Sequence, residues 1–294
     1  MKITAPMTAL LVWLMLIAPA GADIVVRDDS GADIRLKSPA RRIVSLAPHI
    51  TENLYVAGAG AYVVGVTDYS DYPPVARQLP RIGQSGRMDM EALLALKPDL
   101  VIAWQGGTPT TQIEKLKALG LAVFLVRSDR MASVASDIEY YGQLAGTPET
   151  ANRAAAQFRQ RLAALRTTYS GKAPVRVFYQ IWQRPMMTVG ARQLITDAIR
   201  LCGGENIFGQ LSTLAPTVNV EAVLAARPQV IIASGNNAAR PPWLDEWKRW
   251  PQLEAVRRNQ LYHIDPDLIQ RHTFRLLEGA EQLCQQIDSA RIER

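Results

Sequence analysis

The side chains in this chain that are most able to do chemistry are three histidines, at positions 49, 263 and 272. No two of them stand four residues apart, which is the spacing of paired metal ligands on a helix. The sequence also lacks a P-loop and a G-x-S-x-G elbow, and the glycines around Gly58 miss the G-x-G-x-x-G spacing. Because no nucleophile, base and oxyanion donor come together, we predict a binding protein and not an enzyme, with no metal site or cofactor.

Three aromatic residues stand where predicted strands end. Tyr69 lies in TDYSDYPP, Trp104 closes DLVIAW, and Trp182 follows VRVFYQI. The carboxyl ends of parallel strands open onto ligand clefts, and broad rings there suit a large, flat ligand. Packing at the rim or in the core is the alternative for each ring. The tryptophans between 243 and 250 are spaced like one helix face, which favours packing for them.

A glutamate recurs at the same place in two related segments, MDMEALLALKPDLVIAW and VNVEAVLAARPQVIIAS. Asp89 and Asn219 are good N-caps, so Glu91 and Glu221 fall in first helical turns, where the helix dipole favours negative charge. That position is a sufficient structural reason for either residue. Two matching carboxylates would also suit a symmetric membrane partner with basic pockets.

The two cysteines, Cys202 and Cys284, both lie in patterns that favour helices. In an oxidising compartment they can pair, and closing so long a loop would stabilise the fold by about 4 kcal/mol. Two buried free thiols are the alternative. Neither cysteine has the neighbouring histidines or cysteines of a zinc site.

Two similar arrangements of elements position these side chains. The β-rich runs RRIVSLAP and VRVFYQIW are each followed by a polar start, an apolar helical run and a stopping glycine, in HITENLYVAGAG and LITDAIRLCGGE. Together with the repeated segments described above, these patterns predict the same order of elements in each half: a strand, a helix, a short strand, a second helix and a final strand. We therefore predict an α/β protein with two similar lobes, each with a mainly parallel sheet flanked by helices.

The segment between the two halves predicts one long helix. Thr147 suits its N-cap, Pro148 its first turn and Gly171 its end. Its apolar face has helical spacing and comprises Ala154, Phe158, Leu162 and Leu165. A helix from Pro148 to Tyr169 would be about 33 Å long. We expect this rigid helix to hold the lobes at a nearly fixed angle, with the ligand in the cleft between them.

The first residues read as an export signal. Lys2 precedes the apolar run MTALLVWLMLI, and small residues at 20–22 suit cleavage. The run is too short for a comfortable membrane span. We therefore predict a signal peptide at 1–22, an N-terminal α/β lobe at 23–146, a connecting helix at 147–171 and a C-terminal α/β lobe at 172–294.

The bulk composition fits a globular binding protein. The 294 residues are 48% hydrophobic and carry a formal net charge of +6, which allows one large core or two medium ones. A basic balance can suit nucleic acid, but the arginines form no stripe or cluster. No nucleic-acid partner is expected.

Four segments together resemble the BtuF family, the periplasmic vitamin B12-binding proteins of ABC importers: YSDYPP, ALKPDLVIAWQGG, CGGENIF and AEQLC. The resemblance extends from about Ile43 to Ile287. It implies a periplasmic monomer that binds cobalamin or a related corrinoid between its lobes. It also implies delivery to an ABC permease dimer, with its ATPase subunits, at the inner membrane.

Ligand contacts follow from the resemblance residue by residue. Tyr69 and Trp104 match positions that contact the corrin. The stretch DLIQR resembles the family's D-W-F-E-R, so Asp267 and Arg271 match its polar corrinoid contacts. Trp182 is not assigned by the resemblance, but its position after the first strand of the second lobe leads us to expect that it faces the cleft as well.

Two further pairs take roles from the same resemblance. Cys202 and Cys284 match the family's disulfide. Glu91 and Glu221 match two glutamates that dock onto arginines of the permease subunits, one from each lobe.

The sequence departs from the family at three places. Leu268 stands where an aromatic residue is usual, and Ser85 and Ala215 stand near places where tryptophans line the pocket. Losing two rings removes stacking area, at about 25 cal/mol per Å² of apolar surface. Trp182 or Phe274 are candidates to compensate.

The alternative reading on the same scaffold is a carrier of haem or an iron-siderophore. The segments SLAPHITE and KPDLVI occur across that wider class of binding proteins. Haem requires an axial ligand, for which Tyr69, His49 and His272 are the candidates.

Overall fold

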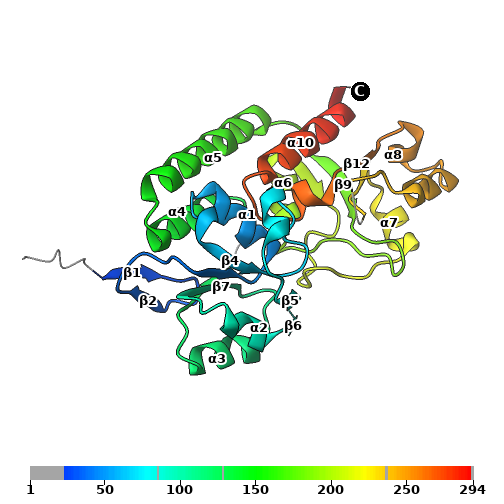
Figure 1. Ribbon diagram of the computed structural model, residues 1–294. Coiled ribbons are helices and arrows are strands. Elements are labelled where there is room, and N and C mark those ends of the chain that lie inside the picture. The colour runs from blue at the N-terminus through cyan, green and yellow to red at the C-terminus, as the bar shows by residue number, and fades with distance from the viewer. Residues whose placement is uncertain (1–22, 85, 128, 236–237, 293–294) are drawn as a thin grey trace, which may run out of the picture.

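The computed structural model describes residues 23–292 apart from 85, 128 and 236–237, and two four-stranded sheets form its centre (Figure 1). Their strand orders are β4-β3-β7-β8 and β10-β9-β11-β12, and all pairings within them are parallel. The first sheet comprises Ile43–Ser45 (β3), Val63–Val66 (β4), Leu100–Trp104 (β7) and Val123–Val126 (β8). The second comprises Val175–Gln180 (β9), Gly204–Asn206 (β10), Val230–Ala233 (β11) and Leu261–His263 (β12). The predicted fold class is confirmed.

The first sheet and its helices form what we call the N-terminal lobe. Strands β3 and β8 are buried along their whole length, as expected for parallel strands covered on both faces. The helices are Pro48–Val56 (α1), Met90–Ala95 (α2), Thr110–Ala118 (α3) and Ser133–Ala145 (α4), with short 3-10 turns at Gly60–Tyr62 and Pro74–Gln78. Two antiparallel hairpins add Ile24–Arg27 (β1) with Asp33–Leu36 (β2), and Gly83–Gln84 (β5) with Arg87–Met88 (β6).

The second sheet and its helices form the C-terminal lobe. Its helices are Leu194–Leu201 (α6), Val220–Ala226 (α7), Glu254–Arg257 (α8), Pro266–Ile269 (α9) and Leu276–Ile292 (α10). A 3-10 helix, η3, spans Pro242–Arg249. Trp247 in this helix is buried, and Trp243 and Trp250 pack against the same apolar cluster. The prediction that these tryptophans serve packing is confirmed.

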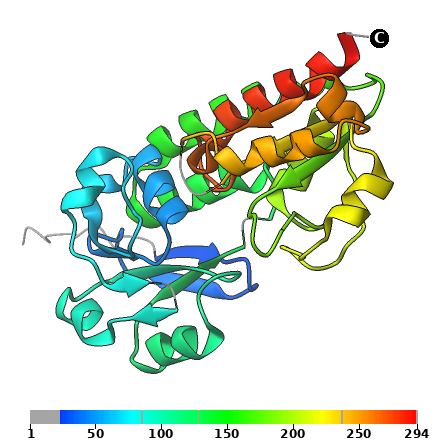
Figure 2. The same ribbon diagram turned by 90° about the vertical axis from the view of Figure 1, so that its right-hand side faces the viewer.

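One long helix, α5, spans Pro148–Tyr169, the range in which the sequence predicts a helix. Phe158 and Leu162 on its apolar face are buried, and Ala154 and Leu165 are half-buried. In Figure 2, α5 and α10 lie side by side along one edge of the molecule, with the two lobes extending away from them. The helix thus packs against both the N-terminal α4 and the C-terminal α10. The domain boundaries and the fixed angle between the lobes stay predictions.

The repeated segments form the same unit twice. Asp89 caps α2 by accepting a hydrogen bond from the Ala92 N–H, and Asn219 caps α7 through the Ala222 N–H. Each helix then leads into a buried central strand, β7 or β11. The N-caps expected from the sequence are therefore present, and they satisfy backbone donors that helix starts leave without partners.

A single apolar core runs through both lobes. Its buried members include Ile50 and Phe124 from the N-terminal lobe, Phe158 from α5, and Val177 and Leu283 from the C-terminal lobe. Smaller clusters cover the outer face of each sheet. Within the residues described, no helix is long and apolar enough to cross a membrane. The predicted signal peptide at 1–22 lies outside the described residues.

The predicted disulfide is confirmed. Cys202, just after α6, is bonded to Cys284 in α10 with an S–S distance of 2.01 Å. Both residues are fully buried in the shared core. The bond joins α10 to the C-terminal end of α6.

Candidate ligand-binding site

Two cavities lie at the carboxyl ends of strands, one in each lobe. The C-terminal cavity has a volume of about 440 Å³ and includes Trp182 after β9 and Gly235 after β11. The N-terminal cavity has a volume of about 270 Å³ and includes Thr67 after β4 and Trp104 at the end of β7. Loops after parallel strands are the usual place for ligand sites in open α/β sheets. The expectation that aromatic rings collect there agrees with this geometry.

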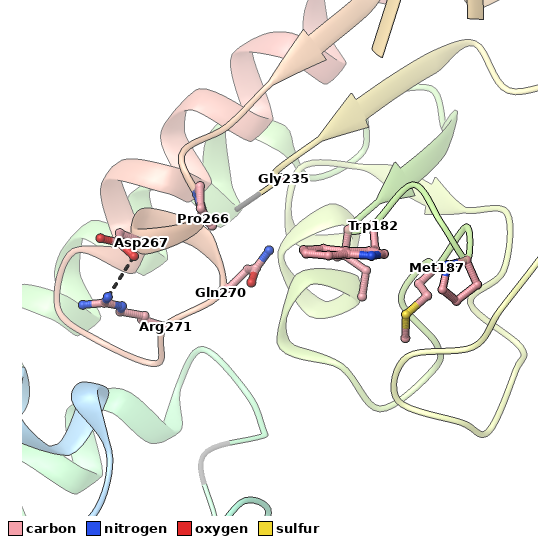
Figure 3. A pocket seen from close by; sticks show the side chains of 9 residues that line it. Trp182, Met187, Gly235, Pro266, Asp267, Gln270 and Arg271 are labelled. Carbon is pink, nitrogen blue, oxygen red and sulfur yellow. Dashed lines mark ion pairs between the residues drawn. The ribbon is translucent and has the colours of Figure 1, made fainter. Parts of the chain in front are cut away.

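The C-terminal cavity places Trp182 opposite a polar wall (Figure 3). The Trp182 ring is 43% exposed, and its Nε1–H donates to the Arg184 carbonyl at 3.1 Å. Gln270 points toward the ring from the other side, and Asp267 and Arg271 form an ion pair farther along the same wall (Figure 3). A ring facing amide, carboxylate and guanidinium groups can hold a ligand that has both apolar and polar edges.

The N-terminal cavity is built around Trp104 and Tyr69. The indole lies directly over Gly107, where an added Cβ would come within 2.1 Å of the ring. Tyr69 is 71% exposed and has a positive φ of 64°, a backbone conformation that residues other than glycine seldom adopt. One face of the Trp104 ring is thus covered by the protein, whereas Tyr69 projects from the surface.

Two buried histidines lie behind Trp104. The His49 ring is 5.3 Å from the Trp104 ring and 5.3 Å from the His272 ring, and His272 is 6.0 Å from Trp104. Burial lowers the pKa of His272 to about 4 and lowers the pKa of His49 well below its usual range. Both imidazoles are therefore neutral at pH 7. His263 has the structural role expected of it, because its Nε2 is 3.1 Å from the Ser234 carbonyl oxygen.

Charged residues join the two cavities. Arg271 lines the C-terminal cavity and donates to Asp71, which follows Tyr69 by two residues, and to Glu52 in α1, at 2.9 Å in each case. Burial acts to lower the pKa of Arg271, but these carboxylates raise it overall, so Arg271 stays charged. Burial raises the pKa of Asp267 in spite of Arg271.

The structure therefore divides the predicted ligand residues between two neighbouring places. Trp182, Asp267 and Arg271 line one cavity, and Tyr69 and Trp104 line the other. The segment 271–272 lies between them, since Arg271 contacts the loop after β4 and the His272 ring adjoins Trp104. Their role in binding a ligand is untested and stays a proposal.

Glu52 and Arg275 are parts of this site that the sequence analysis missed. Glu52 is only 2% exposed and contacts both Arg271 and Arg275. Glu52 belongs to the polar start of the segment HITENLYVAGAG, and polar residues at a helix start are common without any functional role. A signal was present in the sequence, because a carboxylate on a helix that packs into the core needs a cationic partner.

The paired glutamates are exposed on separate lobes. Glu91 lies in the first turn of α2 and Glu221 in the first turn of α7. Neither carboxylate has an ion-pair partner among the residues that the structure describes. Both are thus available to a partner, and their docking role stays a proposal.

The structure describes two of the three residues at which the sequence departs from the family pattern, Ala215 and Leu268. Ser85 lies outside the described residues. Ala215 is half-buried in the loop before α7 and is not among the residues that line either cavity. Leu268, in α9, is half-buried, and Phe274 packs against Phe158 with ring centroids 5.9 Å apart. Phe274 is therefore engaged in the core.

Comparison with known proteins relates this architecture to a family. The sequence profile of the family described as "Periplasmic binding protein" matches residues 43–268. The chain is 39% identical over 247 residues to the vitamin B12-binding protein of Vibrio cholerae serotype O1, covering 84% of this chain and 88% of that protein.

Solved structures show the same fold. The periplasmic vitamin B12-binding protein BtuF of Vibrio cholerae superposes with a TM-score of 0.80 at 38% identity, covering 86% of this chain and 98% of that one. The periplasmic haem-binding protein RhuT from Roseiflexus sp. RS-1 gives a TM-score of 0.74 at 24% identity, covering 85% and 99%. At that identity the second likeness shows the fold alone.

Proposed function

This chain belongs to the periplasmic binding protein family, and on that premise we propose that it captures cobalamin or a closely related corrinoid and delivers it to an ABC importer. The observation that carries the proposal is the 39% identity, over 84% of the chain, to a protein named for vitamin B12 binding. The two cavities support it, because rings and polar groups stand at the positions that the resemblance assigns to ligand contacts.

Each part of the site has a task in holding such a ligand. The face of Trp104 that points away from Gly107, together with the rings of Tyr69 and Trp182, covers apolar parts of the macrocycle. Asp267 and Arg271 exchange hydrogen bonds with its amide side chains. Because Trp104 is already fixed by Gly107 and His49, little ordering of this ring opposes binding. The ligand leaves unchanged, so no bond chemistry is involved.

Delivery assigns a role to the exposed glutamates. Glu91 and Glu221 dock onto arginines of a permease dimer, one from each lobe, and the ATPase subunits of the importer drive the transport. The carrier acts as a periplasmic monomer after its signal peptide is removed. Paired charges of this kind guide association and fix orientation more than they raise affinity.

Haem is the second candidate ligand, and one observation favours it. His49 and His272 lie beside Trp104 with neutral imidazoles, and neutral imidazole is a common axial ligand of haem iron. Several proteins of this fold carry haem-binding names, although they are only 22–24% identical to this chain. Tyr69 is a further axial candidate.

Isothermal titration of the purified chain with cyanocobalamin, cobinamide and haemin tests the proposal. We expect saturable binding of at least one corrinoid with a stoichiometry of one, and weaker or no binding of haemin. Binding of haemin alone, with a Soret shift that is lost in a His49→Ala variant, would transfer the assignment to haem.

A further inference from the structure

Glu52 is a buried charge at the junction of the lobes. It lies in α1 and is 2% exposed. Its Oε1 accepts from Arg271 Nη1 at 2.9 Å and from Arg275 Nη2 at 2.9 Å, and its Oε2 accepts from Arg275 Nε at 2.9 Å. A carboxylate of the N-terminal lobe is therefore held by two guanidinium groups of the C-terminal chain segment.

Stability alone is a poor reason for this arrangement. Removing three charged side chains from water costs several kcal/mol per ion, and apolar residues of similar size often serve the fold as well as a buried ion pair does. The junction is already joined by neutral contacts. Asn53 donates to the His272 carbonyl at 2.8 Å and accepts from the Phe274 N–H at 3.2 Å.

The contacts of Arg271 show what Glu52 determines. Nη1 is shared between Glu52 and Asp71, and Nη2 lies 2.9 Å from an Asp267 oxygen. Asp71 and Asp267 are 40% and 42% exposed at their side chains, whereas Glu52 is not. Glu52 is thus the contact of Arg271 that water cannot replace, and it sets where the guanidinium lies on the cavity wall.

Arg275 fixes Glu52 in turn. Its guanidinium stacks on the Tyr72 ring, 3.8 Å from the ring centroid, while it holds both oxygens of Glu52. Tyr72 follows Asp71 in the loop after β4. The loop that bears Tyr69, helix α1 and the segment 271–275 are therefore locked to one another through a single carboxylate.

We propose that Glu52 is a positioning residue, which presents the Arg271 guanidinium to the ligand and so determines how strongly the cleft binds polar ligand groups. The inference rests on the proposed function, in which Arg271 contacts a corrinoid. Without the Glu52 carboxylate in place, Arg271 keeps only its contacts with the exposed Asp71 and Asp267, so its guanidinium is no longer fixed in one position toward the ligand.

A double-mutant cycle in the full mature chain tests this inference. The four proteins are the unmodified chain, Glu52→Gln, Arg271→Ala and the double variant, and each is titrated calorimetrically with cyanocobalamin. We expect Glu52→Gln to weaken binding about tenfold, which is a loss of about 1.4 kcal/mol of binding free energy. In the Arg271→Ala background we expect the same change to alter the affinity less than about twofold.

The cycle separates positioning from a merely structural effect. A general loosening of the lobes would weaken binding by the same factor in both backgrounds, and that result would overturn the inference. An Arg271→Ala variant with unchanged affinity would also overturn it. If the unmodified chain binds no corrinoid, the proposed function fails first and takes this inference with it.

Two further variants serve as a control and as a substitute in this experiment. Glu281→Gln removes an ion pair between α10 and Arg161 of α5, 2.7 Å long and away from both cavities, and we expect it to leave the affinity unchanged. If Glu52→Gln does not fold, Glu52→Asp takes its place in the cycle under the same criteria, because the shorter side chain cannot hold both guanidinium groups in these positions. Thermal unfolding of every variant reports stability separately.

Discussion

Replacing Trp104 with alanine is the most direct perturbation of the proposed binding surface. One face of the indole lies against Gly107, and the indole is perpendicular to the His49 ring at 5.3 Å between centroids, so the ligand can cover only the remaining face. An aromatic side chain buries 150–250 Å² in full, and one face therefore offers roughly 100 Å². At about 25 cal/mol per Å², its loss weakens corrinoid binding by about 2.5 kcal/mol, or roughly 70-fold.

Isothermal titration with cyanocobalamin measures this effect. Trp243→Ala is the matched control, because that ring is also half-buried but packs against the apolar cluster of the C-terminal lobe. We expect the control to keep its affinity for the ligand. If Trp104→Ala binds within twofold of the unmodified chain while both proteins unfold at the same temperature, Trp104 does not form part of the ligand site.

The remaining predictions concern docking, the disulfide and pH. Changing Glu91 and Glu221 together to arginine should leave cyanocobalamin affinity unchanged but stop ATP-driven uptake into vesicles that contain the importer; continued uptake would remove their docking role. Changing Cys202 and Cys284 together to alanine should lower the free energy of unfolding in urea by about 4 kcal/mol, since the bond closes a loop with a sequence separation of 82; a loss below about 1 kcal/mol would contradict this. Burial lowers the pKa of His272 from 6.5 to about 4, so between these pH values the unfolded chain binds more protons than the folded one, and stability falls as the pH falls through that window. From pH 7 to pH 5 this side chain should contribute a loss of about 2 kcal/mol, so in urea unfolding at each pH the unmodified chain should lose about 2 kcal/mol more than a His272→Gln variant, in which His49 still titrates.

The fold was predictable because its signals are local and repeated. N-caps at Asp89 and Asn219, and the helical spacing of Phe158 and Leu162, each specify an element within a few residues. The two copies of one helix-strand unit then indicate two sheets of the same kind. The β1-β2 hairpin was not anticipated, because each strand has only four residues, and so short an alternation of exposed and buried positions is a weak signal.

Asp267 and Arg271 were assigned through the family resemblance, whereas local pattern alone indicated the site only where a side chain stands at or close after a strand end. Trp104 and Trp182 met that condition, and the structure places each of them in a cavity. The contact of Glu52 with Arg271 joins residues 219 positions apart, and no local pattern encodes such a pairing. The edge contact of His49 with His272 depends in the same way on how the lobes come together.

The uninterrupted interior shared by both lobes has a consequence for how the carrier releases what it holds. A hinge motion of the two lobes would expose the surface between them to water. That surface is apolar, because buried side chains from both lobes form one cluster there. We therefore expect the protein to have nearly the same conformation with and without ligand. Release of the ligand would then require the importer to separate the lobes.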